Sequence, residues 1–136
     1  GDPNRRIMKT LEIGLTYTAE TTVTDKNTAE AYGSGSVAVF ATPAMVALIE
    51  NAARHAVAPA LDPGQSTVGT LIDVTHVKAT PVGRKVFATA TLTAIDGREL
   101  VYEVSARDES GATIGEGVHR RFIVDVEKFL KKASNS

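Results

Sequence analysis

Apolar residues recur along the chain with two different periods, and each period predicts one kind of element. Between residues 42 and 57 they return every three or four positions, which predicts a helix with one buried stripe. Thr42 and Pro43 suit its start, because a threonine hydroxyl can cap a helix and proline fits the first helical position. Pro59 and the Asp-Pro-Gly sequence at 62–64 end it. The stripe consists of Met45, Leu48, Ile49, Ala52, Ala53, Ala56 and Val57.

Most of the remaining chain favours strands, because apolar and polar residues alternate or β-branched residues dominate. The Asp-Gly pair at 96–97 is a strong signal for a tight hairpin, and the Glu-Ser-Gly sequence at 109–111 marks a second turn. The polar, glycine-containing segment 25–35 predicts a loop, 37–40 a short extended piece and 126–132 a short terminal helix. The predicted strands span residues 15–23, 67–77, 86–95, 100–108 and 112–124.

The order of these elements predicts the fold. One strand, one long helix and four further strands joined largely by hairpins give an α+β protein, in which a curved antiparallel sheet wraps around one central helix. This arrangement is the hotdog fold. One helix is too small to cover five strands, so we expect a homodimer at least, and the sequence leaves open whether dimers pair into tetramers. We treat residues 1–136 as a single domain, with 1–10 flexible and Gly1 left over from cloning.

Composition excludes several classes of function. A net charge of −1 argues against a surface for nucleic acid or for an anionic membrane, and no apolar run approaches the roughly 18 residues of a membrane span. The absence of cysteine excludes disulfides and thiolate nucleophiles, and it fits a cytoplasmic location. The three histidines are too scattered to suggest a metal site.

Three reactive side chains stand out in the region from 40 to 76. Thr42 at the helix start, Glu50 within the helix and His76 at the end of the next strand could meet in one pocket, a combination that suits acyl transfer to water. Each also has a structural explanation. Thr42 could simply cap the helix, Glu50 could be a solvated carboxylate paired with Arg54, and His76 could be a core histidine.

Helix geometry adds a constraint on this group. Thr42 and Glu50 are eight residues apart, or about 12 Å along the helix axis. One small reacting carbon does not easily reach both, which suggests a site assembled across a dimer interface. Gly69 in the following strand marks either a bulge or a close crossing of the helix, or it offers its backbone N–H to an oxyanion.

Several stretches together resemble one known family, the fluoroacetyl-CoA thioesterases of the hotdog fold. The likeness covers nearly everything from 37 to 129. The stretches are Val39-Phe40-Ala41-Thr42, Met45-Val46 with Glu50, Pro63-Gly64, Val68-Gly69-Thr70, Val74-Thr75-His76, Ala79-Thr80-Pro81, Gly115 to Arg120, and Glu127-Lys128-Phe129.

The resemblance implies hydrolysis of an acyl-CoA thioester to a carboxylic acid and coenzyme A, with no cofactor beyond the coenzyme A of the substrate. The family's catalytic threonine, glutamate and histidine fall on Thr42, Glu50 and His76. Its oxyanion-side glycine falls on Gly69, and an arginine near the site falls on Arg120. Basic residues near strand ends could meet the coenzyme A phosphates; these are Arg84, Lys85, Arg120 and Arg121.

One segment departs from the family pattern. The fluoroacetate-specific enzyme has phenylalanines just before the helix, whereas residues 33–38 here read Gly-Ser-Gly-Ser-Val-Ala. We therefore expect a different acyl group. Two alternatives to hydrolysis stay open: a hotdog hydratase or dehydratase acting on acyl-CoA, and a non-catalytic acyl-CoA-binding module.

Overall fold

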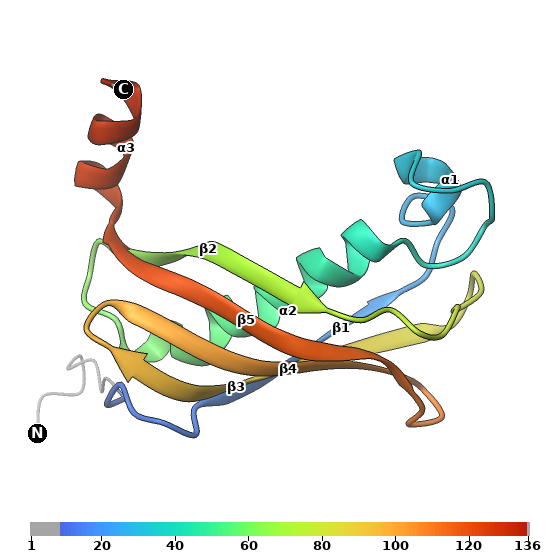
Figure 1. Ribbon diagram of the computed structural model, residues 1–136, viewed down its shortest axis with the longest axis horizontal. Helices are drawn as coiled ribbons and strands as arrows, with labels where there is room; N and C mark the ends of the chain where they lie inside the picture. Colours follow the sequence, from blue (N-terminus) through green and yellow to red (C-terminus); the bar gives the residue numbers. More distant parts are fainter. Residues whose placement is uncertain (1–8, 136) are drawn as a thin grey trace, which may run out of the picture.

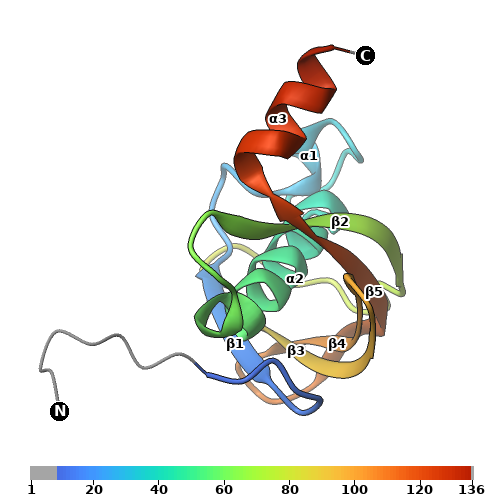
Figure 2. The same cartoon turned by 90° about the vertical axis from the view of Figure 1, so that its left-hand side faces the viewer.

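The computed structural model describes residues 9–135 and shows a curved antiparallel sheet wrapped around a central helix (Figure 1). Within the sheet the strand order is β1-β3-β4-β5-β2, so that β1 and β2 are its two edges. The strands are β1 (Thr16–Thr22), β2 (Gln65–Val74), β3 (Lys85–Asp96), β4 (Glu99–Asp108) and β5 (Thr113–Asp125). Helix α2 (Thr42–Val57) lies in the hollow of the curled sheet (Figure 2). The predicted α+β hotdog fold is confirmed. The expectation that residues 1–10 are flexible concerns mainly residues 1–8, which lie outside the described residues.

Three shorter helical segments complete the structure. Helix α1 (Ala29–Tyr32) lies inside the predicted loop, where Thr28 accepts a hydrogen bond from the Ala31 N–H and Gly33 closes the turn with φ 70°. Four residues are too few to show a helical period, so only these two caps could have indicated it. A 3₁₀ turn (Ala58–Ala60) extends α2, and α3 (Val126–Ser134) follows β5.

Small side chains bring α2 close to the sheet. Its buried face carries four alanines, and the facing strands β3 and β4 contribute further alanines to the same core. Of the predicted stripe only Leu48 stays partly exposed. The largest core side chains fill the space at the ends and sides of this contact: Phe40, Met45, Ile49, Leu92, Leu100, Tyr102 and Ile114. The helix is therefore held against the strands with little room between them.

Strand β2 carries a bulge and ends earlier than predicted. Its pairing with β5 shifts register between Gly69 and Leu71, which confirms the bulge as one reason for a glycine there. The strand ends at Val74 rather than at residue 77. Nevertheless the N–H groups of Thr75 and Val77 donate to carbonyl groups of β5. The segment that carries His76 is therefore held against that strand.

Two glycines of β5 permit this close contact. A Cβ atom at Gly115 would overlap the carbonyl oxygen of Thr75, and one at Gly117 would overlap that of Asp73. The end of β2 thus crosses β5 with backbone where a side chain would otherwise stand.

Gly117→Ala is therefore expected to lower the free energy of unfolding by about 1–3 kcal/mol or more, because the backbone of β5 or that of β2 would have to move to make room for the methyl group. The urea midpoint measures the change. Gly35→Ala is the matched control, since a Cβ there would only meet Ala29 at 3.4 Å. Equal midpoints for the two variants would contradict the crossing.

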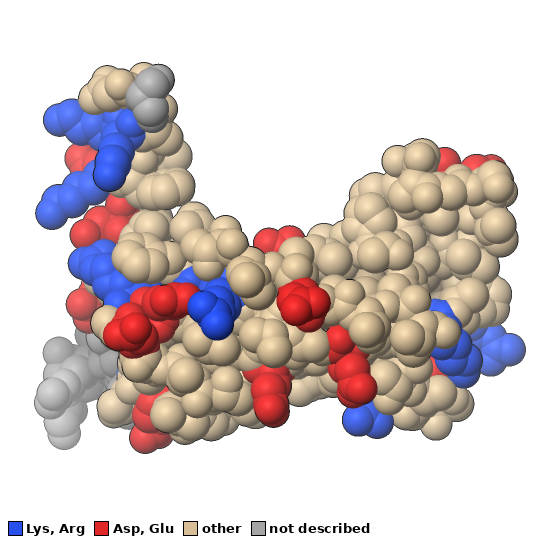
Figure 3. Space-filling view, viewed as in Figure 1, with Lys and Arg blue, Asp and Glu red and all other residues tan. Residues whose placement is uncertain are grey.

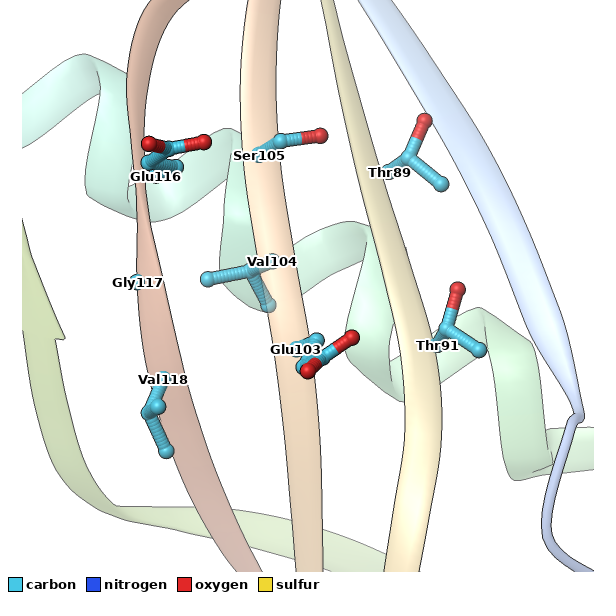
Figure 4. A pocket seen from close by; sticks show the side chains of 8 residues that line it. All are labelled: Thr89, Thr91, Glu103, Val104, Ser105, Glu116, Gly117 and Val118. Carbon is cyan, nitrogen blue, oxygen red and sulfur yellow. The ribbon is translucent and has the colours of Figure 1, made fainter.

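A broad hollow of about 460 Å³ lies on the outer face of the sheet, on the side away from α2 (Figure 4). Its lining is a mixture of hydroxyls, two carboxylates and a few apolar groups. These residues are Thr89, Thr91, Glu103, Val104, Ser105, Glu116, Gly117 and Val118. None of them belongs to the predicted site, which lies in another part of the structure.

Candidate active site

Thr42 and His76 form a hydrogen-bonded pair at the start of α2. Ala41, not Thr42, is the N-cap residue, and no side chain caps the helix. The prediction that Thr42 caps is therefore wrong, and its hydroxyl is used differently: Oγ1 lies 2.6 Å from Nδ1 of His76. This is the distance required between a hydroxyl and the base that takes its proton.

A cleft of about 320 Å³ opens onto this pair. Besides Thr42 and His76 it is lined by Ala29, Ser34, Val39, Phe40, Val77, Lys78 and Ala79. Burial lowers the pKa of His76 below 6.5, and a backbone hydrogen bond with Lys78 offsets part of this effect. The imidazole is therefore neutral at pH 7 and able to accept a proton. Its Nε2 atom is buried and has no hydrogen-bond partner among residues 9–135.

Glu50 lies in a second group, two turns further along α2. Its Oε2 is 3.7 Å from Nη1 of Arg121, and its side chain is 43% exposed. Glu50 therefore does not sit in an apolar crevice, and its ion-pair partner is Arg121 rather than Arg54. The guanidinium of Arg121 is buried and is fixed by Thr67, whose Oγ1 accepts from Nε at 2.7 Å and whose carbonyl accepts from Nη2 at 2.8 Å.

His119 completes this second group. Its Nε2 lies 3.3 Å from Nη1 of Arg121, and because a guanidinium only donates, Nε2 must accept. The proton then belongs on Nδ1, which donates to the carbonyl of Leu71 at 2.7 Å, beside the bulge in β2. Burial, with Arg121 as a further cause, lowers the pKa of His119 below 6.5. His119 is thus a neutral side chain that helps to hold Arg121.

Gly69 faces this group directly. A Cβ atom there would lie 3.0 Å from Oε2 of Glu50 and 3.5 Å from Nη1 of Arg121. The Glu50 side chain of the helix therefore reaches the backbone of β2 at this point. Even alanine would press on the Glu50 carboxylate, so the glycine keeps the space next to it open.

Arg120 lies away from both groups. It is exposed on the other face of β5, where Nη1 is 3.2 Å from Oε1 of Glu99. The place beside Glu50 and Gly69 that the sequence assigned to Arg120 is taken by Arg121. Strand alternation explains the difference, because neighbouring residues of β5 point to opposite faces.

The chain thus holds the predicted residues in two places. Thr42 and His76 meet at one end of α2, while Glu50 and Gly69 meet around Arg121. The eight residues between Thr42 and Glu50 separate the two groups by about 12 Å along the helix. A reaction that needs all three catalytic side chains at one carbon therefore requires more than one chain or a large rearrangement.

Comparison with known proteins gives a consistent answer. The model of the fluoroacetyl-CoA-specific thioesterase family matches residues 23–127. A fluoroacetyl-CoA thioesterase from Streptantibioticus cattleyicolor is 48% identical over 94 residues, which are 69% of this chain and 67% of that protein. This chain belongs to the fluoroacetyl-CoA-specific thioesterase family.

Solved structures agree with this family assignment. A structure of the fluoroacetyl-CoA thioesterase superposes with a TM-score of 0.86 at 37% identity, over 94% of this chain and 98% of that one. A thioesterase superfamily member from Thermus thermophilus gives 0.85 at 27% identity and covers 94% of each chain. The family resemblance seen in the sequence is therefore confirmed, and with it membership of a family of thioester hydrolases.

Two further observations bear on other classes of chemistry. Among residues 9–135 no cluster of three or more histidine, aspartate or glutamate side chains is arranged to hold a metal ion. No helix in this described part is long and apolar enough to cross a membrane.

The sequence did not reveal that Arg121 and Thr67 lie beside Glu50; it gave Arg121 only as one of the basic residues that could meet the coenzyme A phosphates. The signal that could have found Arg121 is Ile123, which is buried and points the same way two residues later.

Proposed function

We propose that this member of the thioesterase family hydrolyses a small acyl-CoA thioester to a carboxylic acid and free coenzyme A. The observation that carries the proposal is the 2.6 Å hydrogen bond between the Thr42 hydroxyl and a neutral His76 inside a cleft. A hydroxyl with a base in this geometry is the arrangement that activates an oxygen nucleophile.

The chemical step balances without a cofactor. His76 accepts a proton from the Thr42 hydroxyl, or from a water that this hydroxyl holds, as the oxygen attacks the thioester carbonyl carbon. The carbonyl oxygen gains negative charge, which the backbone N–H of Gly69 from a second copy of the chain would stabilise, because Gly69 of the same chain lies in the Glu50 group. The carbon–sulfur bond then breaks, the thiolate of coenzyme A takes the proton, and water supplies the second oxygen of the acid. Glu50 would serve as the base for that water.

The proposed active form is a homodimer with sites shared between chains. Within one chain Glu50 stands apart from Thr42 and His76, and β2 is an edge of the sheet with no further strand beside it among residues 9–135. A second copy paired along that edge would bring its own Glu50 toward the Thr42–His76 cleft. Association of dimers into tetramers and a cytoplasmic location stay predictions from the sequence.

The acyl group is proposed to differ from fluoroacetyl. The cleft wall before α2 is formed by Ala29, Ser34, Val39 and Phe40, and segment 33–38 contains no aromatic side chain. Without phenylalanines in segment 33–38, the cleft would accept a short acyl group with less selection for fluorine.

Release of free thiol from a panel of short, branched and aromatic acyl-CoAs tests the proposal. We expect saturable thiol release from at least one short acyl-CoA. Addition of water to an enoyl-CoA without thiol release would favour the hydratase alternative. Binding of acyl-CoA without any turnover would favour the non-catalytic module.

Substitution of the two neighbouring arginines tests which one serves the site. Arg121→Met is expected to cost about 1–3 kcal/mol for each buried group left without its hydrogen bond, and to lower kcat by freeing Glu50, the proposed base. The matched control Arg120→Met removes only an exposed ion pair with Glu99, which is worth less than about 1 kcal/mol. Urea midpoints and kcat values for the two variants measure the difference, and a larger kcat change for Arg120→Met would restore the sequence assignment.

A further inference from the structure

Helix α3 presents an apolar face that residues 9–135 leave partly exposed. Val126, Phe129 and Leu130 are spaced by three and four residues and therefore share one side of the helix. Phe129 is 41% exposed and Leu130 58%, and no residue of α3 is buried. A nine-residue helix of this kind gains stability mainly from packing such a face against something else.

The position of α3 directs that face toward the open edge of the sheet. The Val126 N–H donates to the carbonyl of Gly64 at 2.9 Å, so α3 begins beside the start of β2. From there it projects beyond β2, on the side where the sheet has no further strand (Figure 1). The space-filling view shows a hollow between α3 and the lobe around α1, with the charged residues of α3 on the side away from that hollow (Figure 3).

The floor of this hollow has the properties of an interface. β2 is the last strand of the sheet within residues 9–135, and Leu71 and Ile72 are 42% and 40% exposed. An unprotected apolar edge strand is a template for another strand. A second copy of the same strand fits it with closed twofold symmetry, and the two strands then run antiparallel.

Antiparallel pairing determines what α3 would meet. It places the start of β2 in one chain beside the end of β2 in its partner. Because α3 begins beside the start of β2, it then lies next to the segment that follows β2 in the partner. In that segment Val77 is 70% exposed and lines the Thr42–His76 cleft. Nine helical residues extend about 13 Å, nearly three strand spacings, which is enough to cross the partner's edge strand.

We infer that α3 of each subunit packs, through Val126, Phe129 and Leu130, against Val77 of the partner subunit and forms one wall of the partner's Thr42–His76 cleft. The inference rests on the homodimer of the proposed function, and it adds a role for the C-terminal helix: each cleft is closed by the other chain. The lysines of α3 then stay on the solvent side of the dimer.

Cross-linking can test this contact cleanly, because the chain has no cysteine of its own. The double variant Val77→Cys with Leu130→Cys, treated with a short bifunctional maleimide, is expected to give covalent dimers. Linkage within one chain is not expected, since the two positions lie near opposite ends of a ten-residue strand about 33 Å long. The matched control is Val77→Cys with Lys128→Cys, which places the thiol on the charged side of α3 and should give far less dimer.

Loss of the apolar face gives an independent measurement. Phe129→Ser with Leu130→Ser is expected to raise the dissociation constant of the dimer by about 100-fold or more, as two apolar side chains per subunit are removed from the interface. Lys128→Ser with Lys131→Ser is the control and should leave it unchanged. Sedimentation velocity at several concentrations measures both.

The outcomes separate this inference from the proposed function. A monomeric protein, equal cross-linking of the two cysteine pairs, or a dimer that is unaffected by the serine substitutions would each overturn the role of α3. None of these measurements requires turnover. A protein that cross-links as expected but releases no thiol from any acyl-CoA would therefore refute the thioesterase proposal and leave the α3 contact standing.

Discussion

Glu50→Gln is expected to lower kcat for thiol release by about 10²–10⁴-fold, the usual contribution of a general base. Glutamine keeps the size and shape of the side chain but cannot accept a proton from water. It also leaves the buried guanidinium of Arg121 without its carboxylate, 3.7 Å away in the native protein. Initial rates with the best substrate of the acyl-CoA panel, at saturating concentration, measure the effect.

Glu103→Gln is the control for this variant. Glu103 lies on the outer face of the sheet, in the hollow that faces away from α2 (Figure 4). It carries the same charge change without touching the candidate site, and its kcat should stay within about twofold of the native value, as expected for a surface substitution. A similar rate for both variants would remove Glu50 from the mechanism.

His76→Ala is expected to have an effect of the same size, a loss of about 10²–10⁴-fold in kcat. The Thr42 hydroxyl then loses the acceptor that lies 2.6 Å from it, and no other histidine and no carboxylate is among the described residues that line the cleft. His55→Ala is the control, since His55 is only partly buried and stacks on Tyr17 at a ring-centroid distance of 4.8 Å. Full activity of His76→Ala would show that Thr42 works without it.

The pH profile adds a test that does not alter the protein. Burial lowers the pKa of His76, so its neutral form persists below the usual value of 6.5. The rate should therefore be level above pH 6.5 and fall only as the pH drops through the lowered pKa of His76. Folding stability should change in the same direction, because below pH 6.5 the unfolded chain binds protons that His76 and His119 resist in the folded state. An acid limb centred above pH 6.5 would contradict this placement of His76.

The main elements of the fold could be predicted because local chemistry and tertiary packing agree. The period of the apolar residues in α2 matches its buried face, and the helix spans 42–57 as predicted. Turn residues such as Asp96-Gly97 divide β3 from β4 where expected. Where local pattern and tertiary packing conflict, prediction fails: β2 contains a bulge, and it ends at Val74 rather than at residue 77.

The site could be predicted in its members but not in its arrangement. Thr42 was expected to cap the helix, but Ala41 holds the N-cap position. The Thr42 hydroxyl bonds instead to His76, which lies 34 residues later in the sequence. Likewise the partner of Glu50 lies on β5, so helical spacing, which suggested Arg54, could not find it. Contacts between distant segments depend on how strands cross, and local sequence patterns do not specify how strands cross.

The alanine contact between α2 and the sheet restricts how this protein could acquire new substrates. Ala52 and Ala53 on the helix and Ala88 and Ala90 on β3 are fully buried. Alanine offers almost nothing to remove, so shrinking side chains at these four positions opens no channel for a long hydrocarbon tail beneath the helix. Space for bulkier acids is gained more readily at the helix start, through residues around α1, with the alanine contact left unchanged.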